Sequence, residues 1–219
     1  MGDAEGASHL LSTSPMPPKI APASRELADF YSARACWRSR GEERMRFRKA
    51  SALARVPPGA AVLDIGCRDG GLRAFLPPGV RYQGLDIAPE FAAPDILIQD
   101  ISGGLPFPDG AFDYVFCIDV LEHVPHPFFT LSEIHRVLGR HGVLVLSVPN
   151  PYHVKEIIWN IFRIPDRQGH MYGWTRQTMT RLGEMNGFRL EQSGGTYLHP
   201  PIPMFALLAR SIVYRFVKA

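Results

Sequence analysis

The sequence predicts an α/β fold in which a mostly parallel sheet carries helices on both faces. From Ala61 onward, short apolar runs alternate with helix-length segments, a rhythm typical of parallel sheets. A glycine turn follows the first apolar run, as expected where a strand leads into a helix at a ligand-binding edge. Residues 212–217 alternate apolar side chains with Tyr214 and Arg215, which predicts an antiparallel strand near one edge.

The individual elements follow from the same patterns. Apolar runs predict strands at residues 61–65, 81–86, 95–99, 112–118, 142–148 and 188–193. Helical periodicity and end signals predict helices at residues 70–76, 89–93, 127–138, 154–162 and 175–187. The third of these helices should end before the turn that contains Gly139 and Gly142.

Length and composition indicate one main domain with an N-terminal extension. The chain has 219 residues, 46% of them hydrophobic, which suffices for one substantial core. Residues 1–23 are rich in Ala, Ser, Pro and Gly and predict a disordered leader. Residues 24–58 show helical periodicity, and we expect these helices, with Tyr31 and Trp37, to pack on or cover the core. Residues 59–219 form the main domain.

The charge of the chain gives little support to a polyanionic partner. The net charge is +3, and the basic excess is concentrated between Arg34 and Arg55, where a solvated helix face is the simplest interpretation. No nucleic-acid motif accompanies this patch, so no nucleic-acid partner is expected. The apolar residues Ile202–Leu208 leave peripheral membrane contact open, although core packing explains them more simply. Nothing in the sequence indicates an oligomeric state.

The sequence favours a cytoplasmic location. The N-terminus lacks the basic and apolar regions of a secretory signal, and no segment is long and apolar enough to span a bilayer. The chain has three cysteines, an odd number, and they lack CxxC spacing: Cys36, Cys67 and Cys117. Reduced thiols are therefore expected.

The glycine turn and a spaced acid predict a nucleoside site. A strand runs directly into Gly66-Cys67-Arg68-Asp69-Gly70, which places backbone amides at the carboxyl edge of the sheet. Asp86, at the end of the second strand, is positioned to accept hydrogen bonds from ribose hydroxyls. A nicotinamide dinucleotide is the alternative ligand, but Arg68 would crowd a pyrophosphate. Asp64, just before the turn, suits an ammonium or sulfonium better than a phosphate.

The segment Val62-Leu63-Asp64-Ile65-Gly66-Cys67-Arg68-Asp69-Gly70 resembles motif I of class I S-adenosylmethionine-dependent methyltransferases, especially the type 11 group. Gly84-Leu85-Asp86, Gln99-Asp100-Ile101 and Asp119-Val120-Leu121-Glu122-His123-Val124 are similar to later segments of that family, in the same order. The resemblance covers roughly residues 60–150. It implies a Rossmann-like sandwich with a seven-stranded sheet, and S-adenosylmethionine as the cofactor.

Carried over residue by residue, the resemblance also implies a cofactor site. Asp64 and the turn residues Gly66, Cys67, Arg68 and Gly70 would face the methionine part, Asp86 and Ile87 the ribose, Asp100 and Ile101 the adenine, while Ile118 and Asp119 would flank the cofactor. The family usually has glycine at the position of Arg68. The Arg68 side chain would either turn outward or neutralise the methionine carboxylate. Simpler structural roles remain open for three acids: Asp100 as an Asx-turn residue, Asp113 as a turn anchor and Asp69 as a helix-start charge.

Candidate catalytic groups follow the fourth strand. Methyl transfer needs mainly in-line placement of the acceptor, and a general base only when the acceptor must lose a proton. Glu122 and His123 lie where the acceptor should arrive, and His170 belongs to a loop, residues 164–174, that would act as a lid with Tyr172 and Trp174. An architectural role for the Glu122-His123 pair and a core role for the aromatic residues are the alternatives. No metal is expected.

The acceptor itself has no direct signal in the sequence. A small metabolite, a sugar or a lipid intermediate is the default expectation. Two other functions remain as alternatives: a non-catalytic cofactor-binding regulator of the same fold, and an NAD-dependent oxidoreductase.

Overall fold

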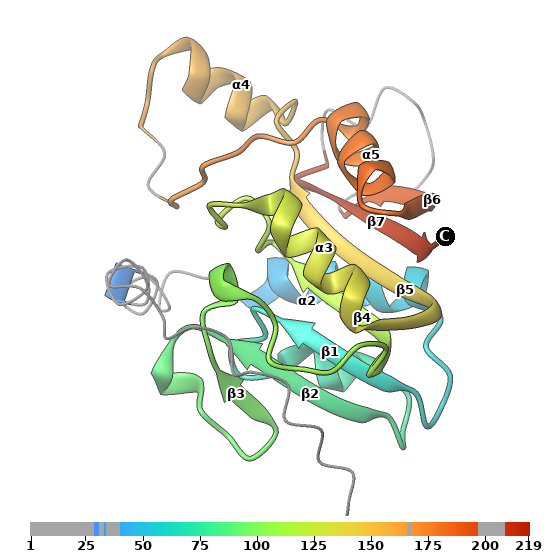
Figure 1. Ribbon diagram of the computed structural model, residues 1–219. Coiled ribbons are helices and arrows are strands. Elements are labelled where there is room, and N and C mark those ends of the chain that lie inside the picture. Colours follow the sequence, from blue (N-terminus) through green and yellow to red (C-terminus); the bar gives the residue numbers. More distant parts are fainter. Residues whose placement is uncertain (1–28, 31–32, 34–39, 166–167, 197–208) are drawn as a thin grey trace, which may run out of the picture.

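The computed structural model describes residues 29–30, 33, 40–165, 168–196 and 209–219. Their centre is one seven-stranded sheet with the strand order β3-β2-β1-β4-β5-β7-β6 (Figure 1). The strands are β1 (Ala61–Ile65), β2 (Arg81–Asp86), β3 (Ile96–Ile98), β4 (Phe112–Ile118), β5 (Leu138–Pro149), β6 (Phe188–Gly195) and β7 (Ser211–Lys218). This arrangement confirms the predicted mostly parallel sheet.

The order of the parallel strands defines the edge of the sheet at which a ligand can bind. Strands β1 to β5 pair in parallel, and β1 lies between β2 and β4, with Asp64 opposite both Gly84 and Phe116. The chain therefore moves outward from β1 to β3 and returns to β4 on the other side, which makes the carboxyl ends of β1 and β4 the switch point of the sheet. Strand β7 lies antiparallel between β5 and β6, as predicted for residues 212–217.

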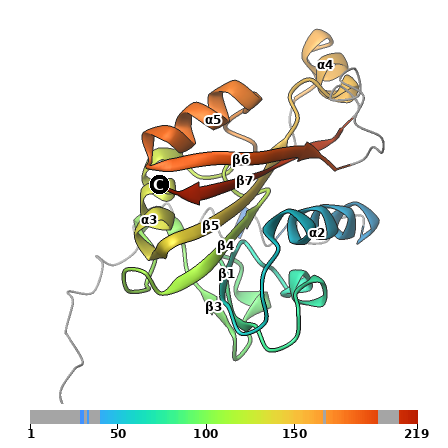
Figure 2. The same cartoon turned by 90° about the vertical axis from the view of Figure 1, so that its right-hand side faces the viewer.

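Helices cover both faces of this sheet (Figure 2). Helix α2 (Arg40–Ala54) packs against β4, β5 and β7 on one face, and α3 (Pro127–Val137) and α5 (Arg176–Met185) cover the opposite face. Because both faces are covered, every residue of β1 is buried. Helix α4 (Val154–Ile161) differs from the others, since it projects beyond the carboxyl end of β5 and has no buried residue.

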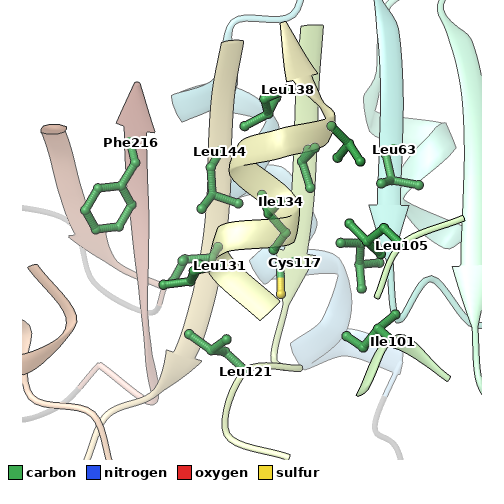
Figure 3. Packing of buried hydrophobic residues seen from close by; sticks show 14 of the residues in the cluster. Leu63, Ile101, Leu105, Cys117, Leu121, Leu131, Ile134, Leu138, Leu144 and Phe216 are labelled. Carbon is green, nitrogen blue, oxygen red and sulfur yellow. The ribbon is translucent and has the colours of Figure 1, made fainter. Parts of the chain in front are cut away.

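The core under α3 is closely packed (Figure 3). Leu131 and Ile134 of α3 point at Leu144 of β5 and at Cys117 of β4, and all four side chains are fully buried. Burial of side chains of this size contributes about 1.5–3 kcal/mol each. This packing fixes the post-β4 segment, because Leu121 belongs to the same cluster.

Several element boundaries differ from the sequence prediction. Residues 70–76 and 89–93, predicted as helices, form short 3-10 turns instead, η2 (Gly71–Phe75) and η3 (Pro89–Phe91). A further 3-10 turn, η4 (Ile101–Gly103), was not predicted. Strand β5 begins at Leu138 and not at residue 142, because Leu138 pairs with Phe112 across an irregularity in the β4–β5 register. A glycine-containing stretch that looks like a turn in the sequence is therefore part of a strand.

Some sequence predictions concern residues outside the described ranges. They are the leader, residues 1–23, the aromatic residues Tyr31 and Trp37, the thiol of Cys36, and the apolar segment Ile202–Leu208. Among the described residues, Cys67 and Cys117 are buried free thiols. In that same part of the chain, no helix combines the length and apolar character needed to cross a membrane.

Candidate cofactor and acceptor site

The turn after β1 passes closely under the segment that follows β4. Gly66 has a φ of +70°, and its N–H donates to the carbonyl of Leu85 at 2.7 Å. A Cβ atom added to Gly66 would lie 2.3 Å from Cγ2 of Val120. Glycine is required here both for its backbone conformation and for this close approach. Gly70 ends the turn with a φ of +73°.

Asp64 lies buried at the carboxyl end of β1. Its side chain accepts a hydrogen bond from the Tyr82 hydroxyl at 2.7 Å. Burial raises the pKa of Asp64 to about 7, and the neighbouring Asp86 carboxylate adds to this increase against the opposing effect of the Tyr82 hydrogen bond. A buried carboxylate with a raised pKa is stabilised in its charged form by a cationic ligand, which suits an ammonium or sulfonium.

Asp86 joins the end of β2 to the glycine turn. Its Oδ2 accepts the N–H of Arg68 at 2.8 Å, and its Oδ1 accepts the N–H of Ala88 at 2.9 Å. The side chain is buried, and the partly buried Ile87 follows it. These two bonds hold the carboxylate beside the turn, at the position predicted for a ribose ligand, and each oxygen retains a further lone pair.

The side chain of Arg68 contacts protein on the α2 side of the turn. Its Nη1 lies 3.2 Å from Oε1 of Glu43, which belongs to α2, and its guanidinium lies 5.5 Å from the ring centre of Phe91. Arg68 has a φ of +52°, in the left-handed region where its family usually has glycine. The side chain is thus largely buried, and its role toward the methionine carboxylate stays a prediction.

The remaining acids divide between the two ends of the sheet. Asp100 accepts the N–H of Ser102 at 2.8 Å and starts η4, so it does form an Asx turn, next to the buried Ile101. Asp69 accepts the N–H of Gly71 at 3.2 Å within the turn. Asp113 accepts the N–H of Ala61, the first residue of β1. Because this bond lies at the amino end of β1, Asp113 is remote from the predicted site.

The end of β4 contacts Arg46 of α2, which the sequence did not predict as a site residue. After the buried Ile118, Asp119 has a φ of +54°, and its Oδ1 accepts the Ser147 hydroxyl at 2.5 Å. Its Oδ2 lies 2.8 Å from Nε of Arg46 on α2. The basic run that contains Arg46 predicted only a solvated face, since periodicity cannot distinguish one inward-facing arginine from its neighbours.

Glu122, His123 and His170 come together at this same edge. Glu122 is fully buried, and its Oε1 lies 3.9 Å from Nε2 of His123. The rings of His123 and His170 are 4.9 Å apart. Residues 168–174 lie against the post-β4 segment, since the N–H of Met171 donates to the carbonyl of Glu122 at 2.9 Å and the Tyr172 hydroxyl donates to that of Pro125 at 3.0 Å. The predicted catalytic candidates thus form one cluster.

Comparison with known proteins decides the family. The family model described as a methyltransferase domain matches residues 37–193, which is most of the chain. The chain belongs to the methyltransferase domain family. Its fold is that of the class I S-adenosylmethionine-dependent enzymes, and S-adenosylmethionine is the cofactor. The antiparallel β7 next to β5 also separates this sheet from the all-parallel dinucleotide-binding arrangement.

Two curated methyltransferases are similar in sequence. The 2-methyl-6-phytyl-1,4-hydroquinone methyltransferase of Synechocystis is 28% identical over 142 residues, which are 59% of this chain and 45% of that protein. The ubiquinone biosynthesis O-methyltransferase of Xanthomonas campestris is 33% identical over 106 residues, 42% of this chain and 44% of that protein. The matched region therefore spans less than half the length of either relative.

A solved structure agrees over nearly the whole chain. The 1,6-didemethyltoxoflavin-N1-methyltransferase of Burkholderia thailandensis, solved with 1,6-didemethyltoxoflavin and S-adenosylhomocysteine bound, superposes with a TM-score of 0.64 at 19% identity. The match covers 96% of this chain and 98% of that one. At this identity the likeness supports the fold of the methyltransferase domain.

Proposed function

We propose that this methyltransferase transfers the methyl group of S-adenosylmethionine to a small molecule that carries an apolar, lipid-like tail. The observation that carries the acceptor class is an exposed apolar surface at the carboxyl edge of the sheet, which we call the apolar rim. It consists of Tyr152, Val154, Ile157, Ile158, Ile161, Phe162, Ile164, Met171 and Tyr172. Ile161 and Phe162 are 68% and 71% exposed, respectively. Large apolar side chains clustered in this way indicate a binding surface.

The residues around the turn after β1 fit the cofactor by their chemistry. Asp86 is positioned for the ribose hydroxyls, Asp100 and Ile101 for the adenine, and Asp64 for the cationic methionine part. Arg46 is the proposed partner of the methionine carboxylate, because its guanidinium forms an ion pair with Asp119 and carries five N–H donors. Arg68, whose Nη1 donates to Glu43, is the other guanidinium beside the turn. The bound cofactor supplies a methyl group that is already activated by its sulfonium.

The protein then has to position the acceptor and exclude water. Residues 168–174 and the post-β4 segment would form one wall of the site through the bonds of Met171 and Tyr172. Orientation of this kind can lower a barrier by about 7–11 kcal/mol. Met171 and Tyr172 of the apolar rim bond the segment that carries Glu122 and His123, so an acceptor tail on this rim would place its head group near His123.

His123 is the proposed base for an acceptor that must lose a proton. Its Nδ1 lies 3.2 Å from the carbonyl oxygen of Gly169, which can only accept a hydrogen bond. The proton is therefore on Nδ1, and Nε2 carries the lone pair that can accept a proton. Glu122, 3.9 Å from Nε2, would stabilise the imidazolium that forms.

The names of the two curated relatives support this acceptor class. One acts on a hydroquinone with a phytyl tail, and the other belongs to ubiquinone biosynthesis. Both names suit an apolar acceptor better than a sugar. No described feature of the site favours a sugar acceptor or a regulatory role without catalysis.

The acceptor class is tested by comparing two hydroquinones, one with and one without a prenyl tail, in a labelled-methyl transfer assay. We expect a higher kcat/KM for the tailed acceptor, and we expect Phe162→Ser to remove this preference. Met185→Ser is the matched control, since Met185 is also exposed, at 59%, but lies on α5. Equal kcat/KM values for both acceptors in the unmodified protein would contradict the proposal.

A further inference from the structure

One cluster of the site combines two imidazoles with a carboxylate. Glu122 and His123 follow β4, and His170 comes from loop 164–174. One potential ligand atom from each of these residues lies within 4.8 Å of the other two. Glu122 is fully buried and the two histidines are partly buried. Two histidines and one glutamate are a common ligand set of catalytic zinc sites, which keep a fourth position open.

The hydrogen bond of His123 prepares this residue for a metal. Metal-binding histidines usually donate their second ring N–H to a carbonyl or carboxylate, which fixes the tautomer and the ring orientation. Nδ1 of His123 makes this bond to the carbonyl of Gly169, at 3.2 Å. In that tautomer Nε2 carries the lone pair, and it lies 3.9 Å from Oε1 of Glu122. That separation is too long for a hydrogen bond between these atoms.

We propose that Glu122, His123 and His170 bind one divalent transition-metal ion of the zinc class. Ligand bonds of about 2.0–2.2 Å in a tetrahedral site place ligand atoms about 3.4 Å apart. On binding, the 3.9 Å distance between Nε2 of His123 and Oε1 of Glu122 would shorten slightly. The longest distance between two ligand atoms, at most 4.8 Å, would shorten by up to about 1.4 Å. Rotation of the partly buried His170 side chain supplies most of this movement.

The expectation of no metal followed from residue spacing alone. His170 is far from Glu122 and His123 in the sequence, and it joins them because residues 168–174 lie against the post-β4 segment. The bond from Met171 to the Glu122 carbonyl brings the residue next to His170 to this position. An ion bound here would add a further connection between residues 168–174 and the post-β4 segment.

The open position of the ion would face the acceptor side of the site. A role of the ion in methyl transfer rests on the proposed function, whereas the binding of the ion itself does not. With an acceptor hydroxyl as fourth ligand, the positive charge of the ion would favour loss of the hydroxyl proton to solvent. The ion would then take the place of His123 as the group that promotes deprotonation.

The test uses the full chain without a histidine tag, stripped of metal by EDTA. Titration with Co²⁺ should produce the visible absorption bands of a low-coordinate site at one equivalent, and Zn²⁺ should abolish them. We expect His170→Ala and His123→Ala to weaken Co²⁺ binding at least about tenfold. His126→Ala is the matched control. His126 is close in sequence to His123, but it is the N-cap residue of α3 and its side chain makes no capping hydrogen bond.

Two results would overturn the proposal: no one-equivalent Co²⁺ binding to the unmodified protein, or equal Co²⁺ affinity in the unmodified and His170→Ala proteins. Circular dichroism of each variant checks folding, and His170→Ala carries the test if His123→Ala does not fold. S-adenosylhomocysteine binding is measured in the same samples. A protein that binds Co²⁺ but not S-adenosylhomocysteine supports the metal site and contradicts the proposed function, and the opposite result does the reverse.

Discussion

The guanidinium of Arg46 lies against the carboxylate of Asp119, with Nε 2.8 Å from Oδ2, and joins α2 to the end of β4. Glu43, one turn earlier on the same helix, contacts Arg68 in the turn after β1. One helix thus connects to both loops of the sheet's switch point. This arrangement places α2 beside the proposed cofactor site, in addition to its packing on the sheet.

Replacement of Arg46 should weaken cofactor binding. We expect Arg46→Met to raise the Kd for S-adenosylhomocysteine about 10- to 100-fold, since a hydrogen bond to a charged group contributes about 1.5–3 kcal/mol. Arg48→Met is the control, because Arg48 lies on the same helix but is exposed. Calorimetric titration measures both, and an unchanged Kd in Arg46→Met would remove Arg46 from the site.

The two aspartates at opposite ends of the sheet should separate binding from stability. Asp86→Asn weakens the acceptor for ribose hydroxyls, and we expect the Kd for S-adenosylhomocysteine to rise about tenfold or more. Asp113→Asn weakens only the bond to the Ala61 N–H, so the free energy of unfolding should fall by about 1 kcal/mol with little change in Kd. Equal effects of both substitutions on the Kd would contradict the assignment of Asp86.

The raised pKa of Asp64 predicts a specific dependence of stability on pH. The pKa is about 7 in the folded protein against 3.8 for a solvent-exposed aspartate carboxyl, so between these values the folded state binds more protons than the unfolded state. The free energy of unfolding should therefore fall as pH rises from about 4 to about 7, by up to about 4 kcal/mol from this group.

Asp64→Asn isolates this contribution, because asparagine still offers an oxygen to the Tyr82 hydroxyl. Urea unfolding at pH 5 and pH 8 measures the effect as the difference between the two proteins. Other groups act in the opposite direction; the Arg136 guanidinium, for example, lowers the pKa of Glu133. If the unmodified protein and Asp64→Asn change in parallel between the two pH values, the Asp64 carboxyl is not the group responsible.

Loop 164–174 should contribute to acceptor binding and leave cofactor binding unchanged. Tyr172 bonds the Pro125 carbonyl and stacks on Trp174, with ring centres 5.2 Å apart. We expect Tyr172→Ala and Trp174→Ala to raise the acceptor KM severalfold, with the Kd for S-adenosylhomocysteine unchanged. Steady-state kinetics with the tailed hydroquinone measures this effect. Unaltered acceptor KM and turnover in both variants would exclude a lid role.

The sequence predicts the sheet well because its strands are buried on both faces. Largely apolar runs such as Ala61–Ile65, in which Asp64 is the one polar residue, admit few other structures, and the residues at their carboxyl ends then share one edge. The lengths of the connecting helices were less predictable, since Gly71–Phe75 forms only a 3-10 turn. Local propensity does not distinguish such a turn from the first turn of an α-helix.

Contacts between distant segments account for most of what the sequence did not predict. Arg46 is one of several arginines in a helix, and only its packing over β4 brings it to Asp119. His170 likewise reaches His123 only through the fold of its loop. The orientation of Arg68 depends on Glu43 of α2, so no local pattern could have decided it.

The central claim is that the carboxyl edge between β1 and β4 binds S-adenosylmethionine through Asp86 and its neighbours. Calorimetric titration of the full chain with S-adenosylhomocysteine, repeated with Asp86→Asn, tests it most directly. We predict binding at one site in the unmodified protein and at least about tenfold weaker binding in the variant. Absence of binding to the unmodified protein, or equal affinity in both proteins, would contradict the claim.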